Sequence, residues 1–297
     1  MTEHSHVNPF KLEGSWFKGN LHTHTLNSDG ALTVEEAYSI YKLNDYDFLF
    51  ITDHRKVTDI HTFQNDPSFL ILNGTELDLP SSEVGTRYHI IGLNISEVID
   101  ANDPQDAISD IQSQGGVALI AHPYWSALSV KDLMELDGYI GIEIFNSHCH
   151  LSRSKGYSTV HWDDLLLRGR QIFGFAVDDC HWHFNDRPFD GCYAWISVKA
   201  SKLDLNSLIS SISNGLFYSS NGPEIYDLTV NENLVSIVTS PAKAISFITF
   251  DGKGFRFNAV DGFISHASFP LDKLESYVRV EVEDAVGHVA WTNPIYL

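Results

Sequence analysis

The segment Leu21–Gly30 reads Leu-His-Thr-His-Thr-Leu-Asn-Ser-Asp-Gly and places His22 and His24 two residues apart. Side chains two apart in a β-strand point to the same face, so a strand here would present both imidazoles together. Two neutral imidazoles on one face can hold one metal ion from one side. Asp29 lies beside Gly30, where a turn is expected, and could reach the same opening. We therefore interpret this segment as the start of a metal site.

Size and composition favour a globular protein without a nucleic-acid or membrane role. The 297 residues suit one barrel-sized domain plus a small one. The net charge of -20 argues against binding nucleic acid, and no apolar run approaches the length of a membrane span. The N-terminus lacks the features of a signal peptide, so we expect a cytoplasmic protein. Three cysteines without C-x-x-C spacing indicate free thiols.

Apolar stretches that are typical of buried strands alternate with helical patterns over the first two thirds of the chain. This alternation predicts a mostly parallel sheet with helices outside it. The helix after the first strand has Thr33 and Glu36 as a capping box. The predicted strands are 16–24, 46–52, 69–72, 88–93, 117–121, 141–145, 171–177 and 193–198. The later predicted helices are 104–114, 130–135, 162–168 and 205–213.

Histidine, aspartate or glutamate follows most of these apolar strands. In barrels of alternating strands and helices, reactive groups gather where the strands end. A single histidine at a strand end is most often structural, and Asp53 and Asp178 could simply cap helices. The ordered series is harder to explain in that way. The candidate ligands are His22, His24, Asp29, His54, Glu76, His89, His122, Asp179 and His181.

These candidate ligands offer nitrogen and oxygen donors and no sulfur. Such a mixed set suits Zn, Mn or Fe(II) better than Ca. Nine ligands exceed the need of one ion, so we predict two or three divalent ions a few ångströms apart, with a carboxylate bridging them. Clustered ions lower the pKa of a bound water and stabilise charge on a phosphoryl or acyl oxygen.

The pattern changes after about residue 190, where one last strand and one last helix are followed by the turn-rich boundary Tyr218-Ser-Ser-Asn-Gly-Pro223. Short β segments follow, and we predict strands at 225–230, 234–239, 245–250, 254–258 and 277–282. We therefore divide the chain into a lead-in at 1–15, a hydrolase barrel at 16–221 and a C-terminal antiparallel β-sandwich domain at 222–297.

The motifs together resemble the PHP (polymerase and histidinol phosphatase) domain. The resemblance is carried by Asn20-Leu21-His22-Thr23-His24, Asp29-Gly30, Ile51-Thr52-Asp53-His54, Glu76, His89, Ala121-His122-Pro123 and Asp179-Cys180-His181. It implies an α/β fold, a distorted (β/α)7 barrel with a two- or three-metal site. It also implies three ligand groups, namely His22, His24, Glu76 and Asp179; Glu76, His89 and His122; and Asp29, His54 and His181.

A narrower resemblance is to the CehA/McbA branch, the carbaryl-hydrolase-like metallohydrolases. It rests on Glu143-Ile-Phe-Asn146, Trp162-Asp-Asp-Leu-Leu166 and the ending Asn293-Pro-Ile-Tyr-Leu297. That branch carries a C-terminal β domain of this kind. The chain departs from many PHP proteins in having Asp178 where serine is usual, and in having Arg55 after the Asp-His pair. These changes keep the ligands and leave the substrate class open.

The sequence predicts a metal-dependent hydrolase, with a metal-activated hydroxide attacking a small-molecule phosphate ester. Asp179, His181, Glu76 and Arg55 are the candidate catalytic residues. Arg55, Arg87 and Arg187 are candidate substrate-binding residues because a guanidinium group can bind two phosphate oxygens at once, and Tyr124 is a further candidate.

Two alternatives to a phosphoesterase stay open. A carboxylic or carbamate ester hydrolase would use the same metal site and an apolar pocket lined by Tyr124, Trp125 and Trp182. A non-catalytic metal-binding protein would use the β domain for interaction. The sequence does not predict the oligomeric state.

Overall fold

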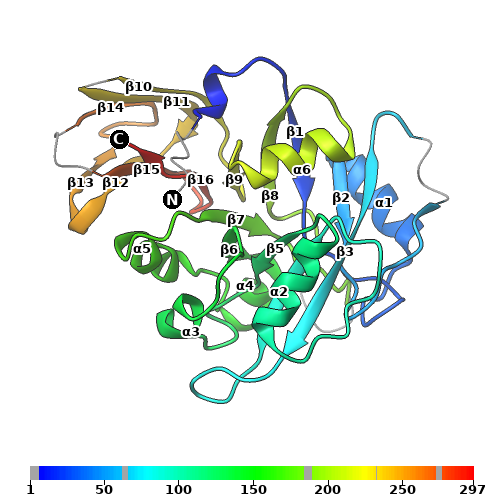
Figure 1. Ribbon diagram of the computed structural model, residues 1–297. Helices are drawn as coiled ribbons and strands as arrows, with labels where there is room; N and C mark the ends of the chain where they lie inside the picture. Colours follow the sequence, from blue (N-terminus) through cyan, green and yellow to red (C-terminus); the bar gives the residue numbers. More distant parts are fainter. Residues whose placement is uncertain (1–6, 62–65, 184–188, 232, 272–275) are drawn as a thin grey trace.

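In a computed structural model, the described residues are 7–61, 66–183, 189–231, 233–271 and 276–297. They form a large mixed sheet, a small antiparallel sheet and helices around the large sheet (Figure 1). The helices are η1 (Pro9–Lys11), α1 (Val34–Leu43), α2 (Pro104–Ser113), α3 (Val130–Met134), α4 (Ser147–Arg153), α5 (Thr159–Leu167), α6 (Leu205–Ser213) and η3 (Phe250–Gly252). None of the described helices is long and apolar enough to cross a membrane.

The strands of the first two thirds of the chain belong to the large sheet. They are β1 (Ser15–Asn20), β2 (Phe48–Ile51), β3 (Leu70–Leu79), β4 (Tyr88–Leu93), β5 (Val117–Ile120), β6 (Gly141–Asn146), β7 (Phe173–Val177), β8 (Trp195–Ala200) and β9 (Phe217–Ser220). The later strands are β10 (Ile225–Asn231), β11 (Leu234–Ala242), β12 (Ala244–Thr249), β13 (Gly254–Asn258), β14 (Ile264–Pro270), β15 (Tyr277–Glu283), β16 (Val289–Thr292) and β17 (Ile295–Tyr296).

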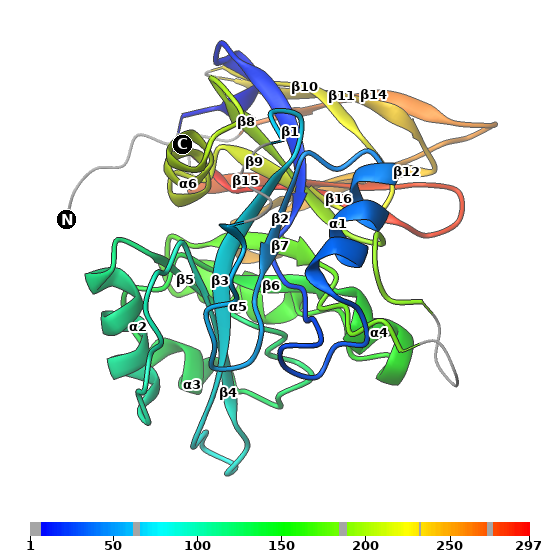
Figure 2. The same ribbon diagram turned by 90° about the vertical axis from the view of Figure 1, so that its right-hand side faces the viewer.

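The large sheet is mixed, which corrects the expectation of a mostly parallel sheet. Strands β1, β2 and β3 are parallel, as are β5, β6 and β7. Strand β4 is antiparallel to both β3 and β5. The reason is that β3 continues to Leu79, past the predicted end at residue 72, and forms a hairpin with β4. The first residues of β4 therefore pair with the last residues of β3 (Figure 2).

The two ends of the β1–β7 series meet beyond the strands. Thr23 and Cys180 form a parallel bridge, and the His24 N–H donates to the Cys180 carbonyl at 3.0 Å. The Asp179 N–H donates to the His22 carbonyl at 2.9 Å. Segments that carry ligands at the two ends of this series are therefore joined by backbone hydrogen bonds.

The large sheet is buried on both faces, as the apolar strands predicted. In β2, Phe48 and Phe50 pack into a core cluster with residues of β3, β4, β5 and β7. Leu49 and Ile51 pack on the opposite face with Tyr41 of α1. Strand side chains alternate between faces, so a continuous apolar run requires cover on both. The capping box of Thr33 and Glu36 forms at the start of α1, as predicted.

The C-terminal strands are divided between the two sheets. Strands β10, β11 and β14 form the small antiparallel sheet, whereas β12, β13, β15 and β16 extend the large sheet through the pairing of β16 with β9. A separate apolar cluster, including Val235 and Phe247, fills the space between these layers. Figure 1 shows the C-terminal strands, yellow to red, gathered on one side of the molecule. The domain boundary at residue 222 stays a prediction.

Candidate metal centre

The structure brings all nine candidate ligands to one edge of the large sheet. They follow β1, β2, β5 and β7, lie in β3 or β4, or belong to the turn that holds Asp29. An open cavity of about 270 Å³ lies at this edge. Its walls are Asp29, His54, Glu76, His89, His122, Trp125, His148, Cys149, Asp179, His181 and His183.

The innermost group consists of His22, His24, Glu76 and Asp179, which are all buried. Nε2 of His22 lies 3.1 Å from Glu76 Oε2 and 3.1 Å from Asp179 Oδ1. Nε2 of His24 lies 3.0 Å and 3.2 Å from the same two oxygens. Two imidazole nitrogens and two carboxylate oxygens thus converge on one point, which is the donor set of a four-coordinate metal site.

Glu76 joins this innermost group to a second one. Its other oxygen, Oε1, lies 2.7 Å from His89 Nδ1 and 3.3 Å from His122 Nε2. The sequence placed Glu76 after a strand, but it lies inside β3, opposite Ile91 of the antiparallel β4. The hairpin of β3 and β4 is what brings His89 to the same carboxylate. One carboxylate that faces two donor groups is suited to bridging two ions.

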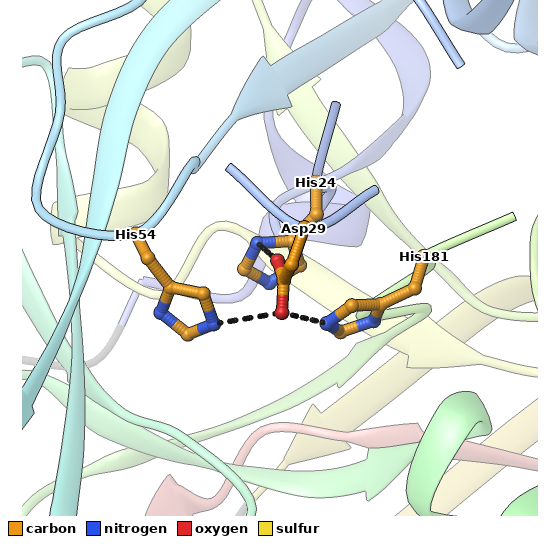
Figure 3. Close-up of side chains that lie close together, drawn as sticks. All are labelled: His24, Asp29, His54 and His181. Carbon is orange, nitrogen blue, oxygen red and sulfur yellow. Dashed lines mark ion pairs between the residues drawn. The ribbon is translucent and has the colours of Figure 1, made fainter. Parts of the chain in front are cut away.

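A third group lies toward the opening and contains His24, Asp29, His54 and His181 (Figure 3). Oδ2 of Asp29 lies 3.6 Å from His54 Nε2 and 3.5 Å from His181 Nε2. Oδ1 of Asp29 lies 3.4 Å from His24 Nδ1. Figure 3 shows the three imidazoles arranged around the aspartate, which is half exposed. This group is the most open of the three.

Gly30 permits the turn that carries Asp29. A Cβ atom on Gly30 would lie 2.5 Å from the carbonyl carbon and oxygen of His24, which is closer than real Cβ contacts. The Gly30 N–H donates to the Thr25 carbonyl at 3.0 Å and closes the turn. The turn thereby places the side chain of Asp29 beside the ring of His24.

Glu143 and Asn146 of β6 support the ligands, a role that the sequence analysis did not assign to them. Glu143 Oε1 accepts a hydrogen bond from His22 Nδ1 at 2.7 Å, and Oε2 accepts one from the His122 N–H at 2.8 Å. Asn146 donates to Glu143 at 2.9 Å and to Asp179 Oδ2 at 3.0 Å. Such partners fix the orientation of a ligating histidine. The sequence signals were a glutamate within the apolar strand 141–145 and the presence of both residues in the motif Glu143-Ile-Phe-Asn146.

Asp178 and Asp53 could have been helix caps by sequence, but in the structure their carboxylates hold loops together. Asp178 accepts hydrogen bonds from the N–H groups of Tyr193 and Ala194 and from the Tyr41 hydroxyl. Burial raises the pKa of Asp178 to about 7. Asp53 accepts from the N–H and the hydroxyl of Thr25, both at 2.7 Å. Both carboxylates therefore lock ligand-bearing segments.

The pKa shifts within the innermost group favour a positive charge among its side chains. Burial opposes charged imidazoles, but Asp179 and Glu76 raise the pKa of His24 to about 9 and that of His22 well above its usual range. Conversely, burial opposes charged carboxylates, but the imidazoles hold the pKa of Glu76 and Asp179 well below the usual range. Among the described residues, Asp179 Oδ1 is buried without a hydrogen bond. An ion between these atoms would satisfy that oxygen, so the residues fit a metal.

His148, His181 and Asp190 form a further group that the sequence did not single out. Asp190 Oδ2 accepts from His148 Nδ1 at 2.8 Å and from the His181 N–H at 3.0 Å. Asp190 Oδ1 accepts from the Trp182 N–H at 3.1 Å. Both oxygens are therefore engaged, and Asp190 holds the ring of His148 in the cavity wall. The relevant partners lie 42 residues apart, which sequence patterns do not reveal.

Three candidate substrate-binding residues, Arg55, Arg87 and Tyr124, do not line the cavity. Arg55 and Arg87 both pair with Asp78, and neither lines the cavity. Arg187 falls outside the described residues. Tyr124 is exposed under Lys155, whose ammonium lies 5.3 Å from the ring centre, and Tyr124 does not line the cavity.

The two tryptophans of the alternative apolar pocket have different positions. Trp182 is fully buried and packs against Tyr41, with its indole N–H donating to the His24 carbonyl. Trp125 lines the cavity and is 40% exposed.

Comparison with known proteins identifies a relative by sequence and a similar fold by structure. No protein-family model matches the chain. A crystal structure of a two-domain Bacteroides vulgatus protein, described as containing a predicted PHP-like metal-dependent phosphoesterase, aligns with 97% of this chain and 98% of its own, with a TM-score of 0.54 and 15% identity. That alignment shows a PHP-like fold.

Two further matches complete the comparison. A candidate metal-dependent phosphoesterase of Bifidobacterium adolescentis aligns over 66% of this chain and 96% of its own, with a TM-score of 0.46 and 14% identity. The uncharacterized protein MJ1587 of Methanocaldococcus jannaschii is 31% identical over 147 residues, which cover 44% of this chain and 82% of that protein. The chain belongs to the same protein family as MJ1587.

Proposed function

We propose that this protein is a metal-dependent hydrolase of phosphate esters that works with two or three divalent ions. One observation carries the proposal. Glu76 faces two ligand groups and His24 faces two, so the three groups are joined into one centre in an open cavity. A chain of shared ligands is suited to holding ions a few ångströms apart, which is the arrangement of multi-metal phosphoesterases.

Each ligand has a place in this proposal. His22, His24, Glu76 and Asp179 would hold the innermost ion. Glu76 would bridge to a second ion held with His89 and His122. Asp29, His54 and His181 would hold a third ion nearest the opening, with His24 at its edge. The donor set suits Zn, Mn or Fe(II).

Bound divalent ions would supply an activated water and neutralise charge on the phosphoryl oxygens. The protein's residues orient those ions and limit how the ester enters. Glu143 and Asn146 fix His22 and Asp179, so the innermost ligands are preorganised. The opening lies on the side of His54 and His181, which are partly exposed. An ester would therefore enter past the third group.

In this proposal, Arg55 and Arg87 stabilise the cavity wall that the β3–β4 hairpin forms. Both pair with Asp78, which lies opposite His89 in the β3–β4 ladder. We assign them to holding that hairpin, and assign recognition of the phosphoryl group to the ions and imidazoles. Residues 16–221 would form the hydrolase unit and 222–297 the β unit. The segments 143–146, 162–166 and 293–297, which resemble the CehA/McbA branch, support assigning the chain to that carbaryl-hydrolase-like branch.

A substrate panel with metal control tests the proposal. The full-length protein is stripped with chelator and reconstituted separately with Zn, Mn and Fe(II). Each form is assayed on 4-nitrophenyl phosphate, 4-nitrophenyl acetate and a 4-nitrophenyl carbamate. We expect metal-dependent hydrolysis that is fastest with the phosphate. Faster turnover of the carboxylic ester or carbamate would favour the alternative esterase, and metal binding without any hydrolysis would contradict an enzymatic role.

A further inference from the structure

Trp125 is the one large apolar side chain among the described residues that line the cavity. The other lining residues are histidines, acidic residues and Cys149. Large aromatic side chains are mostly buried in folded proteins, yet Trp125 is 40% exposed. An exposed indole in a wall of titratable groups is a feature that metal binding alone does not require.

The indole lies directly beside the second ligand group. Its ring centre is 5.0 Å from that of His122 and 5.8 Å from that of His89, and both pairs are T-shaped. These two rings are the ligands that share Glu76 Oε1. A group attached to an ester held at this ligand pair would therefore lie within reach of the indole.

The backbone holds Trp125 in a defined position. The residue before it, Tyr124, donates its N–H to the Ser158 hydroxyl at 3.2 Å, and the residue after it, Ser126, donates its N–H to the His122 carbonyl at 3.1 Å. The Leu128 N–H donates to the Pro123 carbonyl at 3.0 Å. Residues 122–128 thus form a closed turn on the ligand His122. A preorganised aromatic surface loses little entropy when a ligand binds to it.

We propose that Trp125 is a specificity-determining residue that packs against an aromatic ring attached directly to the ester oxygen. This inference rests on the proposed function and names its substrate class as aryl phosphate monoesters. A ring joined directly to the ester oxygen would lie next to the indole, because Trp125 borders the rings of His89 and His122. A nucleoside monophosphate carries its base beyond a ribose and would place the base farther from the indole.

Kinetics with matched substrates test the inference. Phenyl phosphate, methyl phosphate and adenosine 5′-monophosphate are compared on wild type, Trp125→Ala and Trp125→Phe. Aromatic contacts are worth about 0.5–1.5 kcal/mol, so Trp125→Ala should raise KM for phenyl phosphate roughly 3- to 10-fold. KM for methyl phosphate should not change, and Trp125→Phe should keep most of the preference. Tyr226→Ala removes an exposed ring on β10 as a control and should change neither.

Binding of phosphonates separates this inference from the proposed function. Phenylphosphonate and methylphosphonate are titrated calorimetrically into the metal-reconstituted protein, with metal content measured for every variant. We expect phenylphosphonate to bind wild type roughly 3- to 10-fold more tightly than it binds Trp125→Ala. Failure to hydrolyse any phosphate, with this difference intact, would contradict only the hydrolase.

Two results would overturn the role of Trp125. One is an equal loss for phenyl and methyl ligands together with a lower metal content, which would assign Trp125 to positioning His89 and His122. The other is a preference for adenosine monophosphate that disappears in Trp125→Ala, which would assign the indole to a nucleobase.

Discussion

The cluster of Arg279, Asp163 and Glu281 and the cluster around Glu76 both bury charge, but their charges are matched differently. Arg279 is 1% exposed and links β15 to α5. Its guanidinium donates to both Asp163 oxygens at 2.6 and 2.8 Å and to Glu281 at 2.7 Å, and it lies over the Trp162 ring. Every strong donor of that cluster meets an acceptor on the protein.

The cluster around Glu76 has no such internal balance. Imidazole nitrogens of His22 and His24 lie 3.1 Å apart, and Asp179 Oδ1 is buried without a hydrogen bond. Nitrogen and oxygen lone pairs converge on the same points, which is costly unless protons or metal ions lie between them. The first cluster is therefore suited to stabilising the fold, and the second is suited to binding cations.

The largest effect is expected at the bridging carboxylate. Glu76→Gln keeps the size of the side chain but removes the charge that faces two ligand groups. Metal ions stabilise transition-state charge by several kcal/mol, so turnover should fall about 1000-fold or more. Steady-state kinetics on a phosphate ester measure this loss. Turnover within tenfold of wild type would break the assignment of Glu76 as the bridge.

The second largest effect is expected at Arg279 and should be on stability alone. Arg279→Met leaves Asp163 and Glu281 without their cation. Removing one partner of a buried pair costs 3–5 kcal/mol, and we expect about 2–3 kcal/mol because both carboxylates are partly exposed. Urea unfolding measures it.

An exposed ion pair provides the matched control for Arg279. Arg168→Met breaks the pair of Arg168 with Asp164 within α5 and its C-terminal cap, and it should cost less than about 1 kcal/mol. Metal content should not change in either variant. Loss of metal in Arg279→Met would show that the two clusters are coupled.

The third effect concerns the support of the ligands. In Glu143, Oε1 accepts a hydrogen bond from His22 and Oε2 accepts from His122 and Asn146, and Glu143→Gln replaces one of these two acceptors with an amide N–H donor. Loss of such a partner weakens metal binding about 10- to 100-fold. Competition with a chelator of known affinity measures the change. The exposed Glu135→Gln serves as the control, and equal affinity of the two variants would argue against a supporting role for Glu143.

The smallest effect is a pH dependence that metal should remove. In the metal-free protein, the pKa of His24 is about 9, above its ordinary value of 6.5. The stabilisation from its proton is therefore complete below about pH 6.5 and is lost as the pH rises through 9. We expect the melting temperature of the metal-free protein, prepared with a chelator, to fall as the pH rises from 7 to 9. Reconstituted protein should show a smaller fall, and equal falls would contradict ion binding at His24.

The ligands could be predicted from sequence because their signals are local. His22 and His24 form a His-x-His pair after the first strand, and His54, His122 and Asp179 follow apolar strands at the same edge. Strands buried on both faces have a continuous apolar pattern, which β2 confirms. Placing the carboxyl ends of parallel strands at one edge then brings these five ligands together, whereas Glu76 and His89 meet through the β3–β4 hairpin.

The rest depends on pairings that the local sequence does not encode. The direction of β4 is set by its hairpin with β3, and a strand pattern looks the same in both directions. The support of His22 by Glu143 spans 121 residues, and the pair of His148 with Asp190 spans 42. The segments of β12, β13 and β15 were predicted as part of a separate sandwich, and the segment of β16 was not predicted as a strand, so the sequence did not indicate that β16 pairs with β9.

Metal content measured by mass spectrometry is the most direct test of whether the nine ligands form a metal centre. The full-length protein is purified without chelator and without nickel affinity, and Glu76→Gln is prepared in parallel. We expect two to three equivalents of Zn, Mn or Fe in wild type and a clear loss in the variant. Well under one equivalent in wild type, with no increase after reconstitution, would contradict the metal centre and return its histidines to structural roles.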